Sequence, residues 1–552
     1  MPNSNLGSFF DGFDFTDWPP QEIEVSRGAG SPVASQLPVS TTPRQLEGVT
    51  ARSYVSDYYD RVHISPVQLD LGNVVSTQVT PVRAWNAWRV PRTLESIAGT
   101  DEGLQLSGQS EPPLLVPALK ELTWQMSVTP DGQPVLDTRV TWIFDNGEQP
   151  GVRVTANRII AWSFAPDWGD SVLERLSALT DVLQSESGAE QRRALRVAPR
   201  REFEAQMYAE DRERQLLDLA MYGWSGRTWA MPVWPDIQLL QQPVAVGAVR
   251  IACSTAYLDF VQGGMAMLRG DNAFSYEVVQ IKAIDAAGID LQRPTQQAWP
   301  RGSRFYPARA AQLVEQPSLT RITDRAQGAK VHFQVMEVCL WPEVLPSTLY
   351  RGRPVLDERP DESEDLSGTL ERIQLQLDSA LALPRVTELA SRPFPVTGYR
   401  WLGLGRAERS SWRSLVHGLR GRQVAVWVPT HADDLTLVGQ INDVATAMDI
   451  AYVGYTRFAS ARPGRRDIRI QLNDGTVFYR RILNSTELGL ETERLSIDAS
   501  LGRQVLPSQV ARICWMSLSR GNSDTVEIEH ITDSEGLASS AITFRGVPDD
   551  EL

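Results

Sequence analysis

The sequence predicts a mainly-β protein, built from a β-sandwich followed by two duplicated β-barrel or β-sandwich domains with one helix each. Three observations predict this fold class. Residues 63–165 have the pattern of short alternating strands. A segment with the pattern of a helix followed by a strand occurs twice in the rest of the chain, and strand patterns dominate within both copies. At 552 residues the chain is also too long for a single hydrophobic core, so several domains are expected.

Residues 1–60 are expected to form an extended N-terminal arm. Aromatic residues lie among Asp and Gly, a stretch rich in Ser, Pro, Gly and Thr follows, and branched aliphatic side chains are too few to build a core. The arm is either a docking peptide whose aromatics fill grooves on a neighbouring subunit or a tail without fixed contacts. The aromatic residues are Phe9, Phe10, Phe13, Phe15 and Trp18.

Residues 61–165 have the pattern of a β-sandwich. Apolar residues alternate in short runs, separated by turn pairs such as Asp131-Gly132 and Asn146-Gly147, and the apolar run Ile159 to Trp162 closes the segment. About a hundred residues of short strands indicate a sandwich. The run from Ile64 to Val74, followed by Trp85-Asn86, resembles the immunoglobulin-like modules of the abnormal-spindle type. This resemblance implies a display or spacer module.

Tryptophan is frequent, with 16 in the chain, and several cluster by sequence around the sandwich. Such side chains either stack on carbohydrate or pack in a core, and core packing is the interpretation that we favour. The tryptophans concerned are Trp85, Trp88, Trp142, Trp162 and Trp168.

Two stretches of the remaining chain, 195 residues apart (421 − 226), are copies of one segment. In each copy, apolar residues at i, i+3, i+4 and i+7 predict an amphipathic helix, and a break containing glycine leads into an apolar strand. Ile322-Thr323-Asp324 is repeated as Ile531-Thr532-Asp533, and an alternating strand follows each. Duplicated units of this size usually pack side by side. The identical residues are Glu213, Arg214, Gly223, Gly226, Arg227, Ala230 and Val233, repeated as Glu408, Arg409, Gly418, Gly421, Arg422, Ala425 and Val428.

The two copies define repeat 1 at residues 166–345 and repeat 2 at residues 392–552, with a linker at residues 346–391. The linker carries an acidic run from Asp357 to Asp365 and a possible short helix near Leu370 to Leu383. Within the repeats, one helix laid on a mostly antiparallel barrel or sandwich is the expected architecture.

The charge balance is acidic, with 68 Asp and Glu against 54 Lys and Arg and a net charge of −14. Such a chain is a poor candidate for binding duplex DNA, because affinity for DNA comes mainly from positive side chains that neutralise phosphates. The acidity either lines a passage through which DNA slips or serves solubility alone. Two arginine-rich stretches, Arg192 to Arg196 and Arg462 to Arg469, are expected to form salt bridges at subunit contacts.

No motif in the sequence points to catalytic, cofactor-binding or metal-binding residues. The three lysines do not follow glycine, so a Walker A loop is absent, and no Cys-x-x-Cys, His-Glu-x-x-His or Gly-x-Ser-x-Gly occurs. Gly403-Leu-Gly405 is interpreted as a turn rather than a dinucleotide loop. The five histidines are scattered, and the acidic run from Asp357 to Asp365 is interpreted as a solvated loop, with carboxylate chemistry or metal binding as the alternative.

The apolar pattern contains no stretch long enough for a membrane helix, and Met1 to Asp11 lack the pattern of a secretory signal peptide. Three distant cysteines, Cys253, Cys339 and Cys514, give no disulfide framework. We therefore expect a soluble protein made in a reducing cytosol.

The duplicated segments resemble tail proteins of long-tailed phages (siphophages). The paired arginines Arg200-Arg201, a helix, a Gly-Arg turn and the run from Trp229 to Asp236 resemble the ring-forming domain of distal tail and related baseplate proteins. The second copy, from Trp412 to Pro429, and the ending from Asp524 to Phe544 resemble the C-terminal part of uncharacterised phage minor tail proteins. The likeness runs from about residue 190 to residue 548 and rests on structural motifs.

The resemblance implies a structural virion protein of the phage tail tip that is assembled in the host cytoplasm and is not an enzyme. It would connect the tail tube to the hub and fibres and form a channel for DNA passage. Its expected partners are copies of itself in a ring and the tail tube, tape measure, hub and tail fibre proteins, with no membrane, no cofactor, and DNA only in transit. Two ring-type units in one chain leave open a trimer with pseudo-sixfold symmetry or a hexamer. The alternatives are a receptor-binding or carbohydrate-binding tail protein that works through its sandwich and, third, a cell-wall hydrolase.

Overall fold

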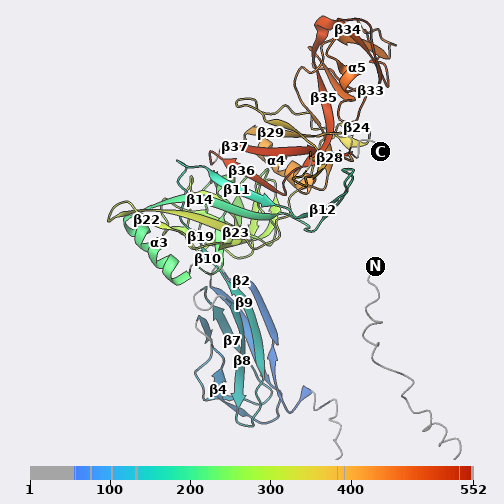
Figure 1. Cartoon of the computed structure of the whole chain (residues 1–552). Coiled ribbons are helices and arrows are strands. Elements are labelled where there is room, and N and C mark those ends of the chain that lie inside the picture. The colour runs from blue at the N-terminus through green and yellow to red at the C-terminus, as the bar shows by residue number, and fades with distance from the viewer. Residues whose placement is uncertain are drawn as a thin grey trace, which may run out of the picture.

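The structure is a computed structural model that describes residues 55, 58–74, 77–100, 103–130, 135–224, 226–381, 383–390, 392–533 and 535–548. Strands make up 49% and helices 9% of it, which confirms a mainly-β fold. Figure 1 shows the sandwich at the bottom, a second body in the middle and a third at the upper right. The predicted arm of residues 1–60 and the predicted turn at Asp131-Gly132 lie outside the described residues, apart from residues 55 and 58–60.

The sandwich consists of two facing sheets, in the strand orders β1-β3-β7-β5 and β2-β9-β8-β4-β6. Trp124 and Trp142 meet edge to face between the sheets at 5.9 Å, and both are buried. Asn146-Gly147 forms the predicted turn between β8 and β9, where Gly147 has a φ of 83°. The strands are β1 (Val62–Ser65), β2 (Gln68–Val74), β3 (Gln78–Asn86), β4 (Arg92–Ala98), β5 (Leu104–Ser107), β6 (Leu114–Val116), β7 (Glu121–Val128), β8 (Val135–Phe144) and β9 (Gly151–Arg158).

The apolar run Ile159 to Trp162, predicted to close the sandwich, belongs instead to the next body. Within it, β10 (Ile160–Ala161) pairs in parallel with β15 (Trp229–Pro232). Trp162 is fully buried against Trp229 and Phe333 in the core of that body. The alternating pattern indicated a buried strand correctly but could not show which core it joins.

Unit 1, the name used here for residues 160–335, is a sheet covered on one face by helix α3 (Asp211–Trp224). The helix packs Leu217, Met221 and Trp224 beside Phe203 and Phe333 of the sheet. A smaller lobe and a hairpin are attached. The sheet strands are β11 (Val172–Ser177), β14 (Arg200–Glu210), β15, β21 (Arg304–Leu313), β22 (Leu319–Arg321) and β23 (Ala326–Val335); the hairpin is β12 (Thr180–Gln184) and β13 (Glu190–Ala194); the lobe is β16 (Gln238–Leu239), β17 (Arg250–Ala252), β18 (Met265–Arg269), β19 (Tyr276–Asp285) and β20 (Gly288–Leu291).

Unit 2, residues 368–547, repeats this plan, with helix α4 (Arg406–Leu419) on the sheet. Trp412 of α4 stacks on Trp401 at 5.0 Å, and both lie in a core with Phe544. The sheet strands are β26 (Gly368–Glu371), β29 (Phe394–Leu404), β30 (Ala425–Pro429), β35 (Val510–Gly521), β36 (Thr525–His530) and β37 (Leu537–Gly546); the hairpin is β27 (Gln374–Leu377) and β28 (Arg385–Glu388); the lobe is β31 (Ala447–Ala451), α5 (Tyr455–Phe458), β32 (Asp467–Leu472), β33 (Val477–Glu487) and β34 (Thr492–Ile497).

The strand pairings of unit 1 recur in unit 2. The lobes repeat even a β-bulge, because the register shifts between Ile281 and Ala283 in β19 and between Ile482 and Asn484 in β33, 201 residues later in both cases (482 − 281 and 484 − 283). The antiparallel pairings β11–β14, β14–β23, β15–β21, β21–β23, β22–β23, β18–β19 and β17–β20 recur as β26–β29, β29–β37, β30–β35, β35–β37, β36–β37, β32–β33 and β31–β34.

The repeated Ile-Thr-Asp segments are the turns that begin the last strand of each sheet. The Thr323 hydroxyl accepts the N–H of Ala326, the first residue of β23, at 3.0 Å. The Thr532 hydroxyl accepts the N–H of Leu537, the first residue of β37, at 3.1 Å. The sequence match therefore marks a turn that needs a threonine hydroxyl as acceptor.

The segment predicted as a linker is largely part of unit 2. Gln374–Leu377 and Arg385–Glu388 form a hairpin rather than the helix expected near Leu370 to Leu383. The preceding strand Gly368–Glu371 pairs with Phe394–Leu404 of the unit 2 sheet. The boundary predicted at residue 392 therefore cuts through the second copy. The β24–β25 hairpin (Leu349–Tyr350 and Arg353–Pro354) lies in the remaining linker.

No helix in the described part of the chain is both long and apolar enough to span a bilayer.

Candidate functional site: the joint between the two units

A single strand joins the two units into one continuous sheet. β11 pairs with β14 of its own unit on one side and with β36 of unit 2 on the other, both antiparallel. The joint runs over six residue pairs, from Val172 opposite His530 to Ser177 opposite Thr525. The resulting sheet of eight strands has the order β22-β23-β14-β11-β36-β37-β29-β26.

The two faces of the joint differ in character. On the face covered by the helices, Leu176 lies opposite Val526, and both are buried in the core of unit 2. On the other face, Arg175 lies opposite Glu527 and donates to its carboxylate at 2.8 Å. This alternation, with a period of two residues, fixes the register because a slip of one residue would bury the ion pair.

Glu174 of β11 is a fully buried carboxylate that binds side chains from both units. It accepts hydrogen bonds from Arg201 at 2.7 Å in unit 1, and from Arg413 and His530 at 2.8 Å each in unit 2. Charged groups almost never lie in a protein interior unless they are paired. The three donors therefore fix how the two units are oriented.

Asp236 forms a second buried link across the joint. It follows β15 of unit 1 and accepts from Arg409 of α4 at 2.6 Å and from Arg413 at 3.4 Å. Arg409 also donates to the carbonyl of Pro235 at 2.9 Å. Behind this pair, Asp259 accepts from Arg201 and Arg309, so the ionic network continues into unit 1.

Burial and neighbouring charge shift the pKa values in this network. Burial raises the pKa of Glu174, but the positive charges of Arg201 and Arg413 and the His530 hydrogen bond outweigh it and hold that pKa well below its usual range. Burial, with help from Arg409 and Arg413, lowers the pKa of His530 to about 4 in spite of the Glu174 partner. At neutral pH the joint therefore contains ionised Glu174 and neutral His530.

The hairpin β12–β13 of unit 1 reaches across the joint and docks on unit 2. The Glu190 carboxylate lies between two unit 2 arginines, accepting from Arg520 at 2.7 Å and from Arg545 at 2.9 Å. At the base of the hairpin, the Thr180 carbonyl accepts from Arg422 at 2.9 Å. Gly188 lies so close to the Phe394 ring that an added Cβ would fall 2.3 Å from it.

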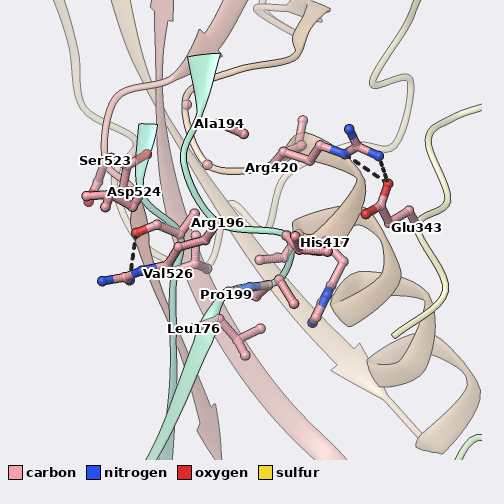
Figure 2. A pocket seen from close by; sticks show the side chains of 18 of the residues that line it. Leu176, Ala194, Arg196, Pro199, Glu343, His417, Arg420, Ser523, Asp524 and Val526 are labelled. Atoms are coloured by element: carbon pink, nitrogen blue, oxygen red, sulfur yellow. Dashed lines mark hydrogen bonds and ion pairs between the residues drawn. The ribbon is translucent and has the colours of Figure 1, made fainter. Parts of the chain in front are cut away.

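A small hollow remains where the hairpin meets α4 and β36. Figure 2 shows Arg196 and Pro199 of unit 1 facing His417 of α4 and Val526 of unit 2, with Arg420 paired to Glu343 at the rim. The cavity measures about 30 Å³, which is room for one or two water molecules rather than for a substrate. The hollow is thus part of a packed joint.

Replacing Glu190 by glutamine is expected to loosen the docked hairpin by about 1–3 kcal/mol, because Arg520 loses its carboxylate partner while buried. Faster hydrogen exchange in peptides covering residues 180–194 would show it. Glu186→Gln, at an exposed position in the turn of the same hairpin, is the matched control and should leave exchange unchanged. Equal exchange in both variants would contradict this role of Glu190.

The structure places the residues that the sequence singled out as follows. Trp142 and Trp162 are core side chains, as favoured, whereas Trp85 stacks on His63 at 5.3 Å and Trp88 donates to Glu148 at 3.1 Å, both half-buried. Gly403 and Leu404 are the last two residues of β29, so the predicted turn is limited to Gly405, which has a φ of 112° and leads into α4.

The charged stretches form ion pairs within the chain. In the acidic run, Asp357 pairs with Arg469 at 2.5 Å and Glu364 with Arg400 at 2.8 Å. In the first arginine-rich stretch, Arg196 donates to the carbonyl of Ser177 at 2.9 Å.

Among the residues that the structure describes, no three His, Cys, Asp or Glu side chains come together in a way that could hold a metal ion. No protein-family model matches the chain, and neither does any curated protein sequence.

Proposed function

We propose that the chain is a structural subunit of a ring in the tail tip of a long-tailed phage, where it connects the tail tube to the hub and fibres around a channel for DNA. The observation that carries this proposal is the joint between the units. Two copies of one fold lie side by side, share one sheet, and are locked by Glu174 and Asp236. Side-by-side copies joined by unlike surfaces are the repeating element of a ring.

The free face of the eight-stranded sheet supports a channel wall. Helices α3 and α4 cover the opposite face with apolar side chains. On the free face, Lys330 pairs with Glu204, and Arg175 pairs with Glu202 and Glu527. These groups are three carboxylates and two cations, so they offer DNA no continuous positive surface to bind.

Three chains would provide six units, which favours a trimer with pseudo-sixfold symmetry over a hexamer. The two units of one chain already occupy neighbouring positions, so each chain would span one third of the ring. The sandwich, attached outside the shared sheet at the unit 1 end, would then project from the ring as a spacer or a binding module (Figure 1).

Negative-stain microscopy of the purified chain tests the proposal. We expect closed rings with a central opening, and a particle mass of three chains of 61.4 kDa by native mass spectrometry. Discrete single chains that bind host surface glycans would refute the ring and support a receptor-binding role of the sandwich instead.

A further inference from the structure

We propose that successive copies of this chain join head to tail: strand β26 and hairpin β27–β28 of one chain dock on strand β22 and the neighbouring sheet surface of unit 1 in the next. This inference rests on the proposed ring and names the surface that closes it. The template is the joint inside each chain, in which β11 and the hairpin β12–β13 contact β36 and its neighbouring sheet surface. Each side of that joint has a counterpart elsewhere in the chain, and neither counterpart pairs with a described strand across the corresponding edge.

The two ends of the eight-stranded sheet are open. Within the described part of the chain, β22 pairs with β23 alone and β26 with β29 alone, and every residue of both strands is exposed. β22 lies at one end of the two units, and the β28 hairpin strand lies toward the other (Figure 1). β22 is the counterpart of β36, and β26 is the counterpart of β11, so each open edge is one half of the internal joint. Unpaired edges of this kind are templates for another chain.

The register of the new joint follows from the duplication. The block β26 to β29 repeats β11 to β14 at a spacing of 194 residues, since Thr180 and Ala194 correspond to Gln374 and Glu388 (374 − 180 and 388 − 194). The Ile-Thr-Asp turns place β36 209 residues after β22 (531 − 322).

Applying these shifts to the internal pair Glu174 and Ile528 gives Gly368 opposite Leu319 (174 + 194 and 528 − 209). The next pair is then Thr369 opposite Ser318. Because the ladder is antiparallel, these pairs should bring their Cα atoms to about 4.5–5.5 Å across the chains.

The hairpin β27–β28 is an apolar arm that no described residue of the same chain covers. Leu381 and Leu383, near its tip, are 95% and 94% exposed, and Leu375 and Leu377 of β27 are exposed as well. The equivalent tip of β12–β13 is docked on unit 2 through Gly188 and Glu190. A cluster of exposed leucines on a protruding hairpin indicates a binding surface.

The three charged residues that hold the docked hairpin in the internal joint have uncharged counterparts in the proposed external joint. Glu190 of the docked hairpin corresponds to Pro384 (190 + 194). Its partners Arg520 and Arg545, which face each other across β35 and β37, correspond to Gln312 and Gln334, which face each other across β21 and β23. A carboxylate lost from the arm is thus matched by two arginines lost from the receiving surface. At this position an apolar arm would therefore meet no buried arginine that needs a carboxylate partner.

One ionic link survives in both halves. Counting four residues on from Pro232 of β15 and from Pro429 of β30 matches Asp236 with Asp433, although Asp236 ends a 3-10 turn and Asp433 lies outside any helix. The helix repeat matches Arg409 with Arg214. Asp433 is exposed and Arg214 is half-buried, and neither forms an ion pair with any residue that the structure describes. Head-to-tail docking would bring Asp433 of one chain to Arg214 of the next.

Paired cysteines test the register. Thr369→Cys combined with Ser318→Cys should give chains linked by disulfides on a non-reducing gel, because the predicted Cα separation suits a disulfide. Thr369→Cys with Leu319→Cys places the second thiol on the opposite face and should give several-fold less linkage, and the single variants control for Cys253, Cys339 and Cys514. No linkage above the single variants would overturn the proposal, whether or not the chain self-associates.

Charge exchange tests the ionic link by sedimentation. Asp433→Arg and Arg214→Glu should each raise the dissociation constant between chains at least about 100-fold, and the double variant should recover to within about 10-fold of the wild type. Asp443→Arg, at an exposed site in the unit 2 lobe, should change nothing. Leu383→Asp should also weaken association, whereas Leu490→Asp, at an equally exposed lobe position, should not.

The outcomes separate this inference from the ring itself. Rings that form and resist the Asp433, Arg214 and Leu383 substitutions would overturn the head-to-tail joint while leaving the ring in place. A wild-type chain that stays monomeric at all concentrations, together with no linkage in the Thr369→Cys and Ser318→Cys double variant, would overturn both.

Discussion

Replacing Glu174 by glutamine is expected to weaken the joint between the two units by about 3–5 kcal/mol. The glutamine keeps the size of the side chain but removes the charge that Arg201, Arg413 and His530 share. It also turns an amide N–H₂ toward arginines that can only donate. Both arginines are at least 97% buried, so neither can find water in place of the lost carboxylate.

Hydrogen exchange at β11 and β36 measures this loss locally, which matters because a chain of several bodies need not unfold in a single step. Peptides covering residues 172–177 and 525–530 should exchange faster together, while the sandwich strands stay protected. Asp137→Asn, which breaks an exposed ion pair with Arg153 in the sandwich, is the control and should change nothing at the joint. Unchanged protection in Glu174→Gln would mean that backbone pairing and Leu176 alone hold the units together.

The sequence predicted the duplicated helix and strands because the core imposes strict demands there. Helix positions such as Leu217 and Trp412 must be apolar, and Thr323 and Thr532 must supply a hydroxyl acceptor. Such positions tolerate few residue types, so they remain similar after duplication. The same pattern indicated two units with a helix leading into a strand in each, although it placed the start of the second unit too late, at residue 392.

The repeated hairpin was missed, although a signal existed. Leu176, Leu183 and Leu195 recur as Leu370, Leu377 and Leu389, 194 residues later in each case (370 − 176, 377 − 183 and 389 − 195). Gly405, inserted before α4, changes the spacing to 195 residues for the helix, so a comparison anchored on the helix loses the hairpin. An exposed hairpin also carries few core constraints, so few of its residue types need to stay the same after duplication.

The buried ionic network could not be predicted from the sequence. Glu174 and His530 lie 356 positions apart, and Asp236 and Arg409 lie 173 apart. Periodicity assigns residues to faces of strands and helices, but it does not say which faces meet. The recurrence of Arg214 as Arg409 was visible, yet only the structure shows that Arg409 is paired and buried, whereas Arg214 forms no ion pair with any described residue.

Lowering the pH from 6.5 to 4 is expected to loosen the joint through His530. The folded state holds this ring with a pKa of about 4, whereas the ordinary value is 6.5. Between these two pKa values, His530 is protonated in the unfolded chain but not in the folded chain, so the free energy of unfolding falls as the pH falls. The contribution is complete above pH 6.5 and is lost by pH 4, a change of about 3 kcal/mol for this one residue.

The window between pH 6.5 and 4.5 separates His530 from its partner Glu174, because the lowered pKa of Glu174 means that its contribution is lost only below about pH 4.5. His417 and His431 are also held near 4 by burial and should contribute in the same direction. His530→Gln keeps an N–H donor for Glu174 but cannot titrate, so the melting temperature of the calorimetric transition that includes the two units should fall less than in the wild type across this window. His63→Gln, the same substitution in the sandwich, should follow the wild type. Parallel curves for wild type and His530→Gln would show that protonation of His530 does not oppose the joint.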